Sequence, residues 1–205
     1  YQSINQDLAR ESSRTREWAT LDMKDASDLV SCELVGFLFQ EDYKFLDSTR
    51  STATRLPNGT IVPLRKFAPM GSALCFPIES LCFWAVAVAA IVDHTGWPVG
   101  KVKDWVYVYG DDIIVKTEYA DLVISALLRV GLKVNFEKSL IDGYFRESCG
   151  VDAYKGVDIT PIRVRTLWTG KPGDGTCLAS YSSYANSFQS SCYSETAQYI
   201  WDELE

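Results

Sequence analysis

Apolar residues recur with two different spacings along the chain, and each spacing predicts a different kind of element. Residues 18–23 read as a strand, and apolar residues at helical spacing follow from Leu29 to Leu38. A long apolar helix is expected from Pro77 to about Asp93, because proline is favoured in a first helical turn. A further helix is expected over residues 120–130, stopped by Gly131.

Two hairpins are expected between these elements. Residues 52–68 predict a hairpin about Pro57-Asn58-Gly59, since Asn-Gly is a strong turn signal. Two β-rich runs, 105–109 and 113–115, enclose Gly110-Asp111-Asp112 and predict a second, tighter one. Strands and helices alternate along the chain without a parallel-sheet phosphate-loop signature.

The two ends of the chain give weaker patterns. Residues 1–20 predict a short helix followed by a loop around Ser12-Ser13. After a probable strand at 132–136, β-like pieces continue to Val164. From Thr169 onward Gly, Ser, Tyr and Thr dominate, and only the segment near 194–204 is expected to be helical.

Composition limits the class of protein. With 205 residues and 47% hydrophobic content, the chain can bury a core. Its longest apolar run, Leu81 to Val92, is 12 residues, short of the roughly 20 that cross a bilayer, so a buried helix and no membrane are expected. Because the sequence begins at Tyr1 without an initiator Met or an export signal, we interpret it as part of a longer polypeptide.

Cysteine and histidine usage argues against a zinc site. The six cysteines form no Cys-x-x-Cys pair, and His94 is the single histidine, to which we assign no catalytic role. Reduced thiols in a cytoplasm are the better interpretation. The Asn58-Gly59-Thr60 sequence matches a glycosylation pattern but is better explained as a hairpin turn.

The most informative tetrapeptide is Tyr109-Gly110-Asp111-Asp112. Two adjacent carboxylates in a turn between apolar strands favour a divalent cation. Mg²⁺ uses one or two carboxylates together with substrate phosphates, and Asp22, at the end of a predicted strand, is the second candidate acid. Two bridged ions would support nucleotidyl transfer.

Each motif taken singly also has a structural explanation. Gly and Asp are common in surface turns, and Asp25 and Asp28 would favour a helix N-terminus. The order of the motifs is more informative, because a strand-borne Asp22 is followed by a Gly-Ser loop, the Gly-Asp-Asp hairpin and then Lys138.

Several of these stretches together resemble the RNA-dependent RNA polymerases, and more closely the replicases of levivirus-type single-stranded RNA bacteriophages. The resemblance runs from about residue 4 to 164. It is carried by short motifs, of which Phe145 to Gly150 is the most particular to the phage enzymes: Ile4-Asn5-Gln6, Asp22 with Ala26-Ser27-Asp28, Met70-Gly71, Glu79-Ser80-Leu81, Tyr109 to Ile114, Phe145 to Gly150 and Gly156-Val157-Asp158.

The resemblance implies an α+β fold: a right-hand polymerase palm with an antiparallel sheet and flanking helices, part of the fingers and the start of the thumb. Residues 1–164 would form the palm with part of the fingers, and residues 165–205 a C-terminal extension, the possible start of the thumb. Asp22 and Asp111 would bind catalytic Mg²⁺, with Mn²⁺ able to substitute, and Asp112 would support them.

The resemblance also assigns roles around these acids. Asp28 would lie near the incoming ribose, and Gly71 and Ser72 would contact the nucleotide or template. Lys138 would be a general acid for pyrophosphate, with a solvated surface lysine as an equal alternative. Arg146 would hold RNA, although an Arg146–Glu147 surface pair explains the same residues.

This chain departs from the family pattern in two places. It has Gly71-Ser72-Ala73 where the family has Gly-Asn-Gly, so the selection of the ribose is open. Lys24 and Asp25 replace small residues beside the first aspartate. Asp25 is then either a nearby metal ligand or a partner of the helix dipole, and we favour the helix role.

The net charge of −7 is the main compositional argument against this hypothesis, because a protein that binds phosphates through lysine and arginine is expected to be basic. Basic finger segments outside this chain would account for it. The family further implies an RNA template and product, nucleoside triphosphates, the host translation elongation factors Tu and Ts, a ribosomal protein, and the cytoplasm of a bacterial host.

The main hypothesis is therefore RNA-templated RNA synthesis from nucleoside triphosphates, for the replication of a viral RNA genome. Two alternatives remain at this point: a non-catalytic RNA-binding or assembly protein with a polymerase-like fold, and a reverse transcriptase. The Phe145 to Gly150 stretch argues against the second.

Overall fold

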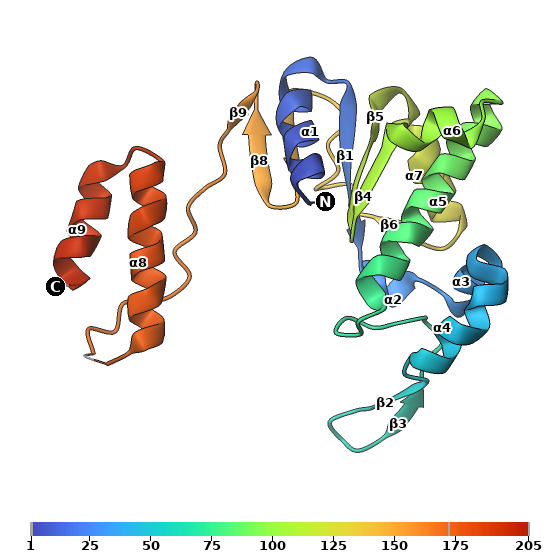
Figure 1. Cartoon of the computed structure of the whole chain (residues 1–205), viewed down its shortest axis with the longest axis horizontal. Coiled ribbons are helices and arrows are strands. Elements are labelled where there is room, and N and C mark those ends of the chain that lie inside the picture. Colours follow the sequence, from blue (N-terminus) through green and yellow to red (C-terminus); the bar gives the residue numbers. More distant parts are fainter. Residues whose placement is uncertain (1, 172, 205) are drawn as a thin grey trace. The chain divides into compact units, whose positions relative to one another are not determined.

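The computed structural model describes residues 2–171 and 173–204 (Figure 1). By its internal contacts the chain divides into two units, Tyr1–Ile159 and Thr160–Glu205. This division lies five residues before the predicted one at 164/165. The interpretation of the units as palm and extension stays a prediction, whereas the mixture of helices with antiparallel sheet confirms the α+β class.

The first unit is built on a four-stranded antiparallel sheet of order β4-β5-β1-β6. Its strands, in that order, are Val106–Tyr109, Asp112–Lys116, Trp18–Lys24 and Lys133–Val134. The predicted strand at 18–23 and the predicted hairpin about Gly110-Asp111 are both confirmed, and they are neighbours in the sheet because β5 pairs with β1.

One face of this sheet carries the main core. Leu21 and Met23 of β1 and Ile113 of β5 pack there with the helices α5 (Cys75–Thr95) and α7 (Ala120–Arg129). The buried positions of α5 recur every three or four residues, as expected for a helix with one face on a core. By length and composition α5 could also cross a membrane, a property that core helices share, so the expectation of no membrane stays a prediction.

The other face is covered by the N-terminal helix α1, Gln2–Thr15, through Ala9 against Trp18 and Ile114. The loop expected at Ser12-Ser13 is wrong, because both serines are buried within α1. The hydroxyl of Ser12 accepts a hydrogen bond from the Trp18 backbone N–H at 2.9 Å, and that of Ser13 accepts one from Gly156 at 2.7 Å. Their polar side chains therefore join α1 to the sheet.

Smaller elements complete this unit. Beside α1 lies a three-stranded antiparallel sheet of β7 (Phe145–Ser148), β8 (Val151–Tyr154) and β9 (Val157–Asp158). The remaining elements are α2 (Ala26–Leu29), α3 (Cys32–Phe39), η1 (Gln40–Asp42), α4 (Tyr43–Thr49), the hairpin strands β2 (Ala53–Arg55) and β3 (Ile61–Pro63), α6 (Val99–Val102), η2 (Lys103–Trp105) and η3 (Thr117–Tyr119).

The second unit contains a helix that the sequence analysis did not predict. Helix α8, Gly175–Ser190, packs on α9, Ser194–Leu204, whereas only the latter was expected. The carboxylate of Asp174 caps α8 by accepting from the Cys177 N–H at 3.1 Å. The many serines in this segment obscured the helical pattern. In the structure, the hydroxyls of Ser180 and Ser187 each donate a hydrogen bond to the backbone carbonyl four residues earlier.

Arg146 on β7 is fully buried, and the predicted RNA contact is therefore wrong. Its guanidinium donates to the Trp18 carbonyl at 2.8 Å and to four carbonyls of the segment 141–145, at distances of 2.7–3.2 Å. Burial lowers the pKa of this group. The alternative surface pair with Glu147 is also wrong, because the five hydrogen bonds make Arg146 a structural clamp between β1 and the loop before β7.

We predict that Arg146→Met lowers the free energy of unfolding by about 3 kcal/mol, because the buried Trp18 carbonyl and four partly buried carbonyls lose their charged donor. Urea denaturation followed by circular dichroism measures this change. Arg55→Met on the exposed β2–β3 hairpin is the control and should change stability by less than about 0.5 kcal/mol. Equal denaturation midpoints for the two variants would contradict the clamp.

Candidate active site

The pairing of β1 with β5 brings the predicted acids together. Asp22 and Asp112 are direct partners across the two strands, so their side chains lie on the same face of the sheet. Asp111 is in the adjoining turn, and its carbonyl accepts the Met23 N–H at 3.2 Å. Residues 90 positions apart thus meet at one end of the sheet.

Neighbouring residues orient two of these carboxylates. The Asn135 side-chain amide donates to Asp22 Oδ2 at 2.8 Å, and Ser139 Oγ accepts the Asp22 backbone N–H at 3.2 Å. On the neighbouring strand, Asp112 Oδ2 accepts the backbone N–H of Cys149 at 2.9 Å. Sequence analysis missed Asn135, Ser139 and Cys149 as partners, because each is distant in sequence from the acid that it contacts.

The three acids also interact through their charges. Burial raises the pKa of Asp112, and the nearby negative charges of Asp111 and Asp22 raise it further, against the lowering effect of the Cys149 hydrogen bond. A cation between these carboxylates would reduce their mutual repulsion. The electrostatics of this end of the sheet therefore favour positive charge.

The donor chemistry suits Mg²⁺ only together with further ligands. Among the described residues no group of three or more His, Cys, Asp and Glu side chains could hold a metal ion by itself. Mg²⁺ commonly binds one or two protein carboxylates and completes its shell with waters and substrate phosphates. The acids present fit an ion of that kind, which arrives with a phosphorylated substrate.

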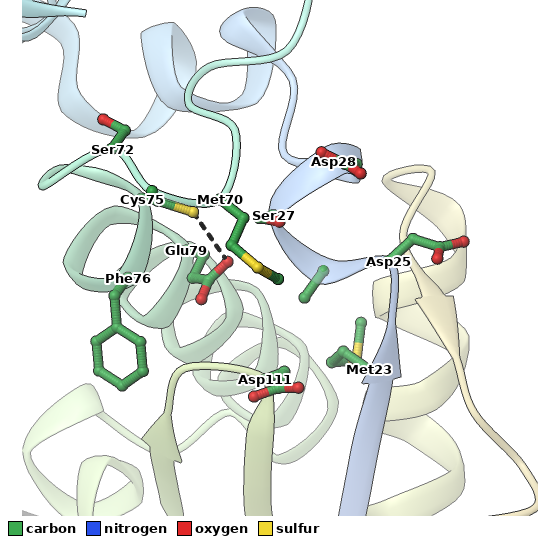
Figure 2. Close-up of a pocket in the computed structure, with 12 residues that line it drawn as sticks. Met23, Asp25, Ser27, Asp28, Met70, Ser72, Cys75, Phe76, Glu79 and Asp111 are labelled. Carbon is green, nitrogen blue, oxygen red and sulfur yellow. Dashed lines mark hydrogen bonds between the residues drawn. The ribbon is translucent and has the colours of Figure 1, made fainter. Parts of the chain in front are cut away.

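A cavity of about 460 Å³ opens beside Asp111 (Figure 2). It lies between the end of β1, α2, the loop before α5 and the first turns of α5. Four acids line it, Asp25, Asp28, Glu79 and Asp111, and no Lys or Arg does among the described residues. An uncompensated phosphate would be repelled here, whereas carboxylates readily accept hydrogen bonds from hydroxyl groups.

The predicted nucleotide-binding residues Asp28, Gly71 and Ser72 all line this cavity. Asp25 lines it too, from a left-handed backbone conformation with φ 53°, and its side chain makes no capping hydrogen bond to α2. Asp25 stands at the N-cap position of α2, and its favoured role as a partner of the helix dipole stays a prediction. Lys138 is exposed in the turn at 136–138 and does not line the cavity.

Glu79 is the residue of this cavity whose role the sequence analysis missed. It is only 7% exposed, and Figure 2 shows its carboxyl group between Met70 and Asp111, with Cys75 Sγ donating to Oε2 at 3.7 Å. Burial raises the pKa of Glu79 to about 7, and the charge of Asp111 adds to the shift. Its position within an apolar helix concealed that the side chain faces the cavity.

The turn that carries Asp111 is tightly packed against α5. Ser80 Oγ accepts the Gly110 N–H at 2.8 Å, and Gly110 has a φ of +63°. A Cβ at this glycine would lie 2.4 Å from Cε2 of Phe76. Residue 110 must therefore be glycine for both backbone and steric reasons.

We predict that Gly110→Ala destabilises the chain by about 2–3 kcal/mol, since it adds a steric overlap to the usual cost of a left-handed alanine. Gly131→Ala is a matched control, because Gly131 has a φ of +82° with no atom within 4 Å of the added Cβ, and should cost about 1 kcal/mol. Thermal unfolding of both variants measures the difference, and identical losses would show that Phe76 moves away freely.

Glu79 predicts a pH dependence of stability in metal-free buffer. The folded chain retains a proton that the unfolded chain releases above its ordinary pKa of 4.5, so wild-type stability falls as pH rises from 4.5 to about 7. Glu79→Gln removes this loss and should gain on the order of 2 kcal/mol relative to wild type across that range. Urea denaturation at several pH values tests this, and Glu118→Gln, at an exposed position, is the control. If the stability of wild type and of Glu79→Gln changed with pH in parallel, Glu79 would not keep a proton in the folded chain.

Comparison with known proteins places this geometry in a family. Residues 1–171 match the family model described as RNA replicase, beta-chain. The chain is 40% identical over 165 residues to the RNA-directed RNA polymerase beta chains of Enterobacteria phage fr and Escherichia phage MS2. It is 38% identical over 167 residues to the RNA-directed RNA polymerase subunit beta of Escherichia virus Qbeta.

These alignments cover 80% of this chain but only 27–29% of each relative, so the chain spans less than a third of their length. The family match covers more than half of the chain and includes the whole sheet with its three acids. The chain therefore belongs to the RNA replicase beta-chain family.

Proposed function

We propose that this chain is the catalytic palm of a phage RNA-directed RNA polymerase and that it catalyses template-directed nucleotidyl transfer. The observation that carries the proposal is the pairing of Asp22 with Asp112 next to Asp111, which itself lines an acidic cavity. The family supports viral RNA replication as the process. The same resemblance suggests the host factors Tu and Ts, a ribosomal protein and the bacterial cytoplasm.

In the proposed mechanism Asp22 and Asp111 hold the catalytic Mg²⁺ ions, for which Mn²⁺ substitutes. When bound, the ions activate the primer 3′-hydroxyl for attack on the α-phosphorus and stabilise the leaving pyrophosphate. Asn135 orients the Asp22 carboxylate through its 2.8 Å hydrogen bond. Asp112, which is tied to the Cys149 N–H, contributes negative charge and supports the other two acids.

The remaining cavity residues suit the sugar of a nucleoside triphosphate. Because its lining is acidic, the phosphates would lie with the ions near Asp111, and the ribose hydroxyls would face Asp28, Ser72 and Glu79. Gly71, with a φ of +97°, lets the loop backbone pass close to the nucleotide. Lys138 is the proposed proton donor to pyrophosphate, and its exposed turn follows directly after Asn135.

A specific feature separates this proposal from a non-catalytic RNA-binding protein. A binding protein has no need for three neighbouring carboxylates of which two raise the pKa of the third, Asp112, whereas a metal-dependent enzyme does. The reverse transcriptase alternative has no such feature in its favour, because the family members matched are RNA-directed RNA polymerases.

We predict that Asp22→Asn and Asp111→Asn each lower nucleotide incorporation on an RNA template at least about 100-fold, because each weakens the binding of an ion that stabilises the transition state. Incorporation of labelled nucleotides with Mg²⁺ or Mn²⁺ is measured with a replicase polypeptide that includes these residues. The wild type should prefer ribonucleotides to deoxyribonucleotides.

The exposed Asp104→Asn, in η2, is the matched control and should retain wild-type incorporation. Circular dichroism of all variants checks that they are folded. Unchanged incorporation by Asp22→Asn or Asp111→Asn would overturn the site assignment. A folded wild type that binds RNA but incorporates no nucleotide would favour the binding protein.

A further inference from the structure

The segment that contains the β2–β3 hairpin, residues 48–78, has the opposite charge to the rest of this acidic chain. Residues 48–78 contain four of the 20 basic residues and none of the 27 acidic ones. The basic residues are Arg50, Arg55, Arg65 and Lys66. A local excess of positive charge in a chain of net charge −7 indicates a specific anionic partner rather than a general property of the surface.

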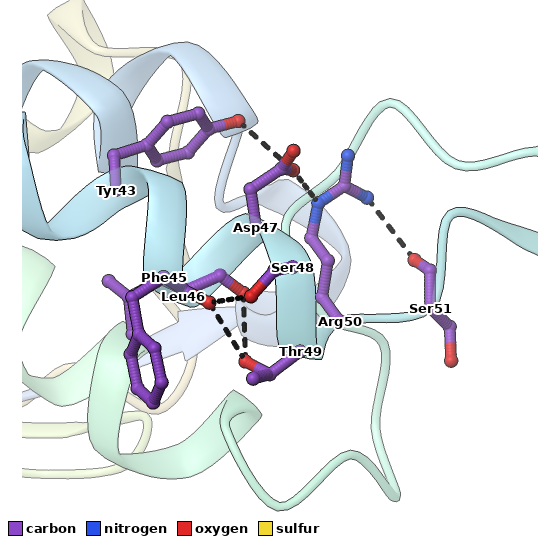
Figure 3. A network of polar contacts seen from close by, with 8 residues as sticks. All are labelled: Tyr43, Phe45, Leu46, Asp47, Ser48, Thr49, Arg50 and Ser51. Atoms are coloured by element: carbon purple, nitrogen blue, oxygen red, sulfur yellow. Dashed lines mark hydrogen bonds and ion pairs between the residues drawn. The ribbon is translucent and has the colours of Figure 1, made fainter.

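Two of these cations have partners within the chain, and two do not. Arg50 Nε pairs with Asp47 at 2.6 Å (Figure 3), and Lys66 Nζ donates to the Leu29 carbonyl at 3.3 Å. The guanidinium groups of Arg55 and Arg65 make no hydrogen bond or ion pair to any other residue that the structure describes. Both residues are exposed and available to a ligand.

The base of the hairpin is held firmly even though its strands are exposed. Tyr43 and Arg50 both bond to Asp47, and Arg50 also donates to the Ser51 carbonyl at 3.2 Å (Figure 3). On the other side, Phe67 N–H donates to the Val30 carbonyl at 2.9 Å. Arg55 and Arg65 are therefore presented from a fixed base, which lowers the entropy lost on binding.

No described element of its own unit covers the hairpin. Residues 51–63 are all exposed, including Ile61 and Val62, and the ribbon extends away from the rest of its unit (Figure 1). A two-stranded hairpin without a further layer is only marginally stable in water. A bound partner would stabilise it.

The base of the hairpin also leads to the nucleotide cavity. A second cavity, of about 500 Å³, is lined by Arg65, Lys66, Pro69 and the β3 end of the hairpin, and Asp28 lines both this cavity and the one beside Asp111. An extended polyanion lying along the hairpin base would therefore reach the proposed site of nucleotide addition.

We propose that the β2–β3 hairpin binds the phosphates of a single-stranded RNA segment through Arg55 and Arg65 and leads that segment to the nucleotide cavity. This inference rests on the proposed function for the identity of the polyanion. Contacts of this kind are independent of base sequence and sensitive to salt, because each neutralised phosphate releases a counterion.

The test is fluorescence anisotropy of a labelled oligouridylate with the full chain, at several salt concentrations. Arg55→Gln and Arg65→Gln should each weaken binding about threefold to tenfold at low salt. Each should also lower the slope of log affinity against log salt by about 0.7, the value for one phosphate contact on a single strand. Arg65→Lys should retain most of the affinity and the slope, since it keeps the charge.

Arg129→Gln is the matched control, because Arg129 is an exposed arginine at the end of α7, on a different element. Affinities and slopes of the hairpin variants equal to those of this control would overturn the proposal, as would a wild-type chain that does not bind the oligonucleotide. Loss of incorporation in Asp111→Asn with intact RNA binding tests the catalytic site separately. If wild-type replicase incorporates no nucleotide but the hairpin variants still lose RNA affinity, the proposed polymerase function is overturned, whereas RNA binding through Arg55 and Arg65 is supported.

Discussion

The antiparallel pairing of β1 with β5 is the interaction on which the rest of this structure depends. Its register sets Leu21 opposite Ile113 in the core and Asp22 opposite Asp112 on the other face. A slip of one residue would turn Asp22 toward α5 and Leu21 away from it, since side chains alternate along a strand. The apolar core therefore holds the acids in register, because a change in their alignment would expose the core residues.

Several buried polar groups reinforce this register from outside the sheet. Arg146 donates to the Trp18 carbonyl at the start of β1, and Ser12 and Ser13 tie α1 to β1 and to the loop before β9. Asn5 of α1 also donates to the Asp112 carbonyl at 3.3 Å. These contacts satisfy backbone groups that would otherwise be buried without partners, so polar residues here contribute to the fold rather than to ligand binding.

Charge is distributed unevenly over the described residues. The acids gather at the end of the sheet and around the first cavity, where ions and sugar hydroxyls are favoured. Arg55 lies on the β2–β3 hairpin, and Arg65, just after it, lines the second cavity; neither guanidinium group has a partner among the described residues. An overall charge of −7 therefore does not conflict with RNA binding, because attraction for phosphate depends on the local field.

By itself, the sequence determined the elements whose signals are local. The strand at 18–23, the Asn-Gly hairpin, the turn at Gly110-Asp111 and the helices near 77–93 and 120–130 were all predicted within a few residues, because periodicity and turn chemistry act over short distances. The motif order also pointed to the family and to Asp22, Asp111 and Asp112. Helix α8 was missed because its serines resemble those of a loop.

Only the tertiary structure decided which polar side chains face a cavity and which are buried. The sequence predicted that Arg146 contacts RNA, but its side chain is buried and holds backbone carbonyls together. Asp25, at the start of α2, also lines the cavity, which the sequence could not show. Glu79 appeared to be one residue of an apolar helix and is a buried acid beside Asp111. Orientation of this kind depends on residues that lie far away in the sequence, such as Trp18 for Arg146 and Asp111 for Glu79, and no local pattern records such pairs.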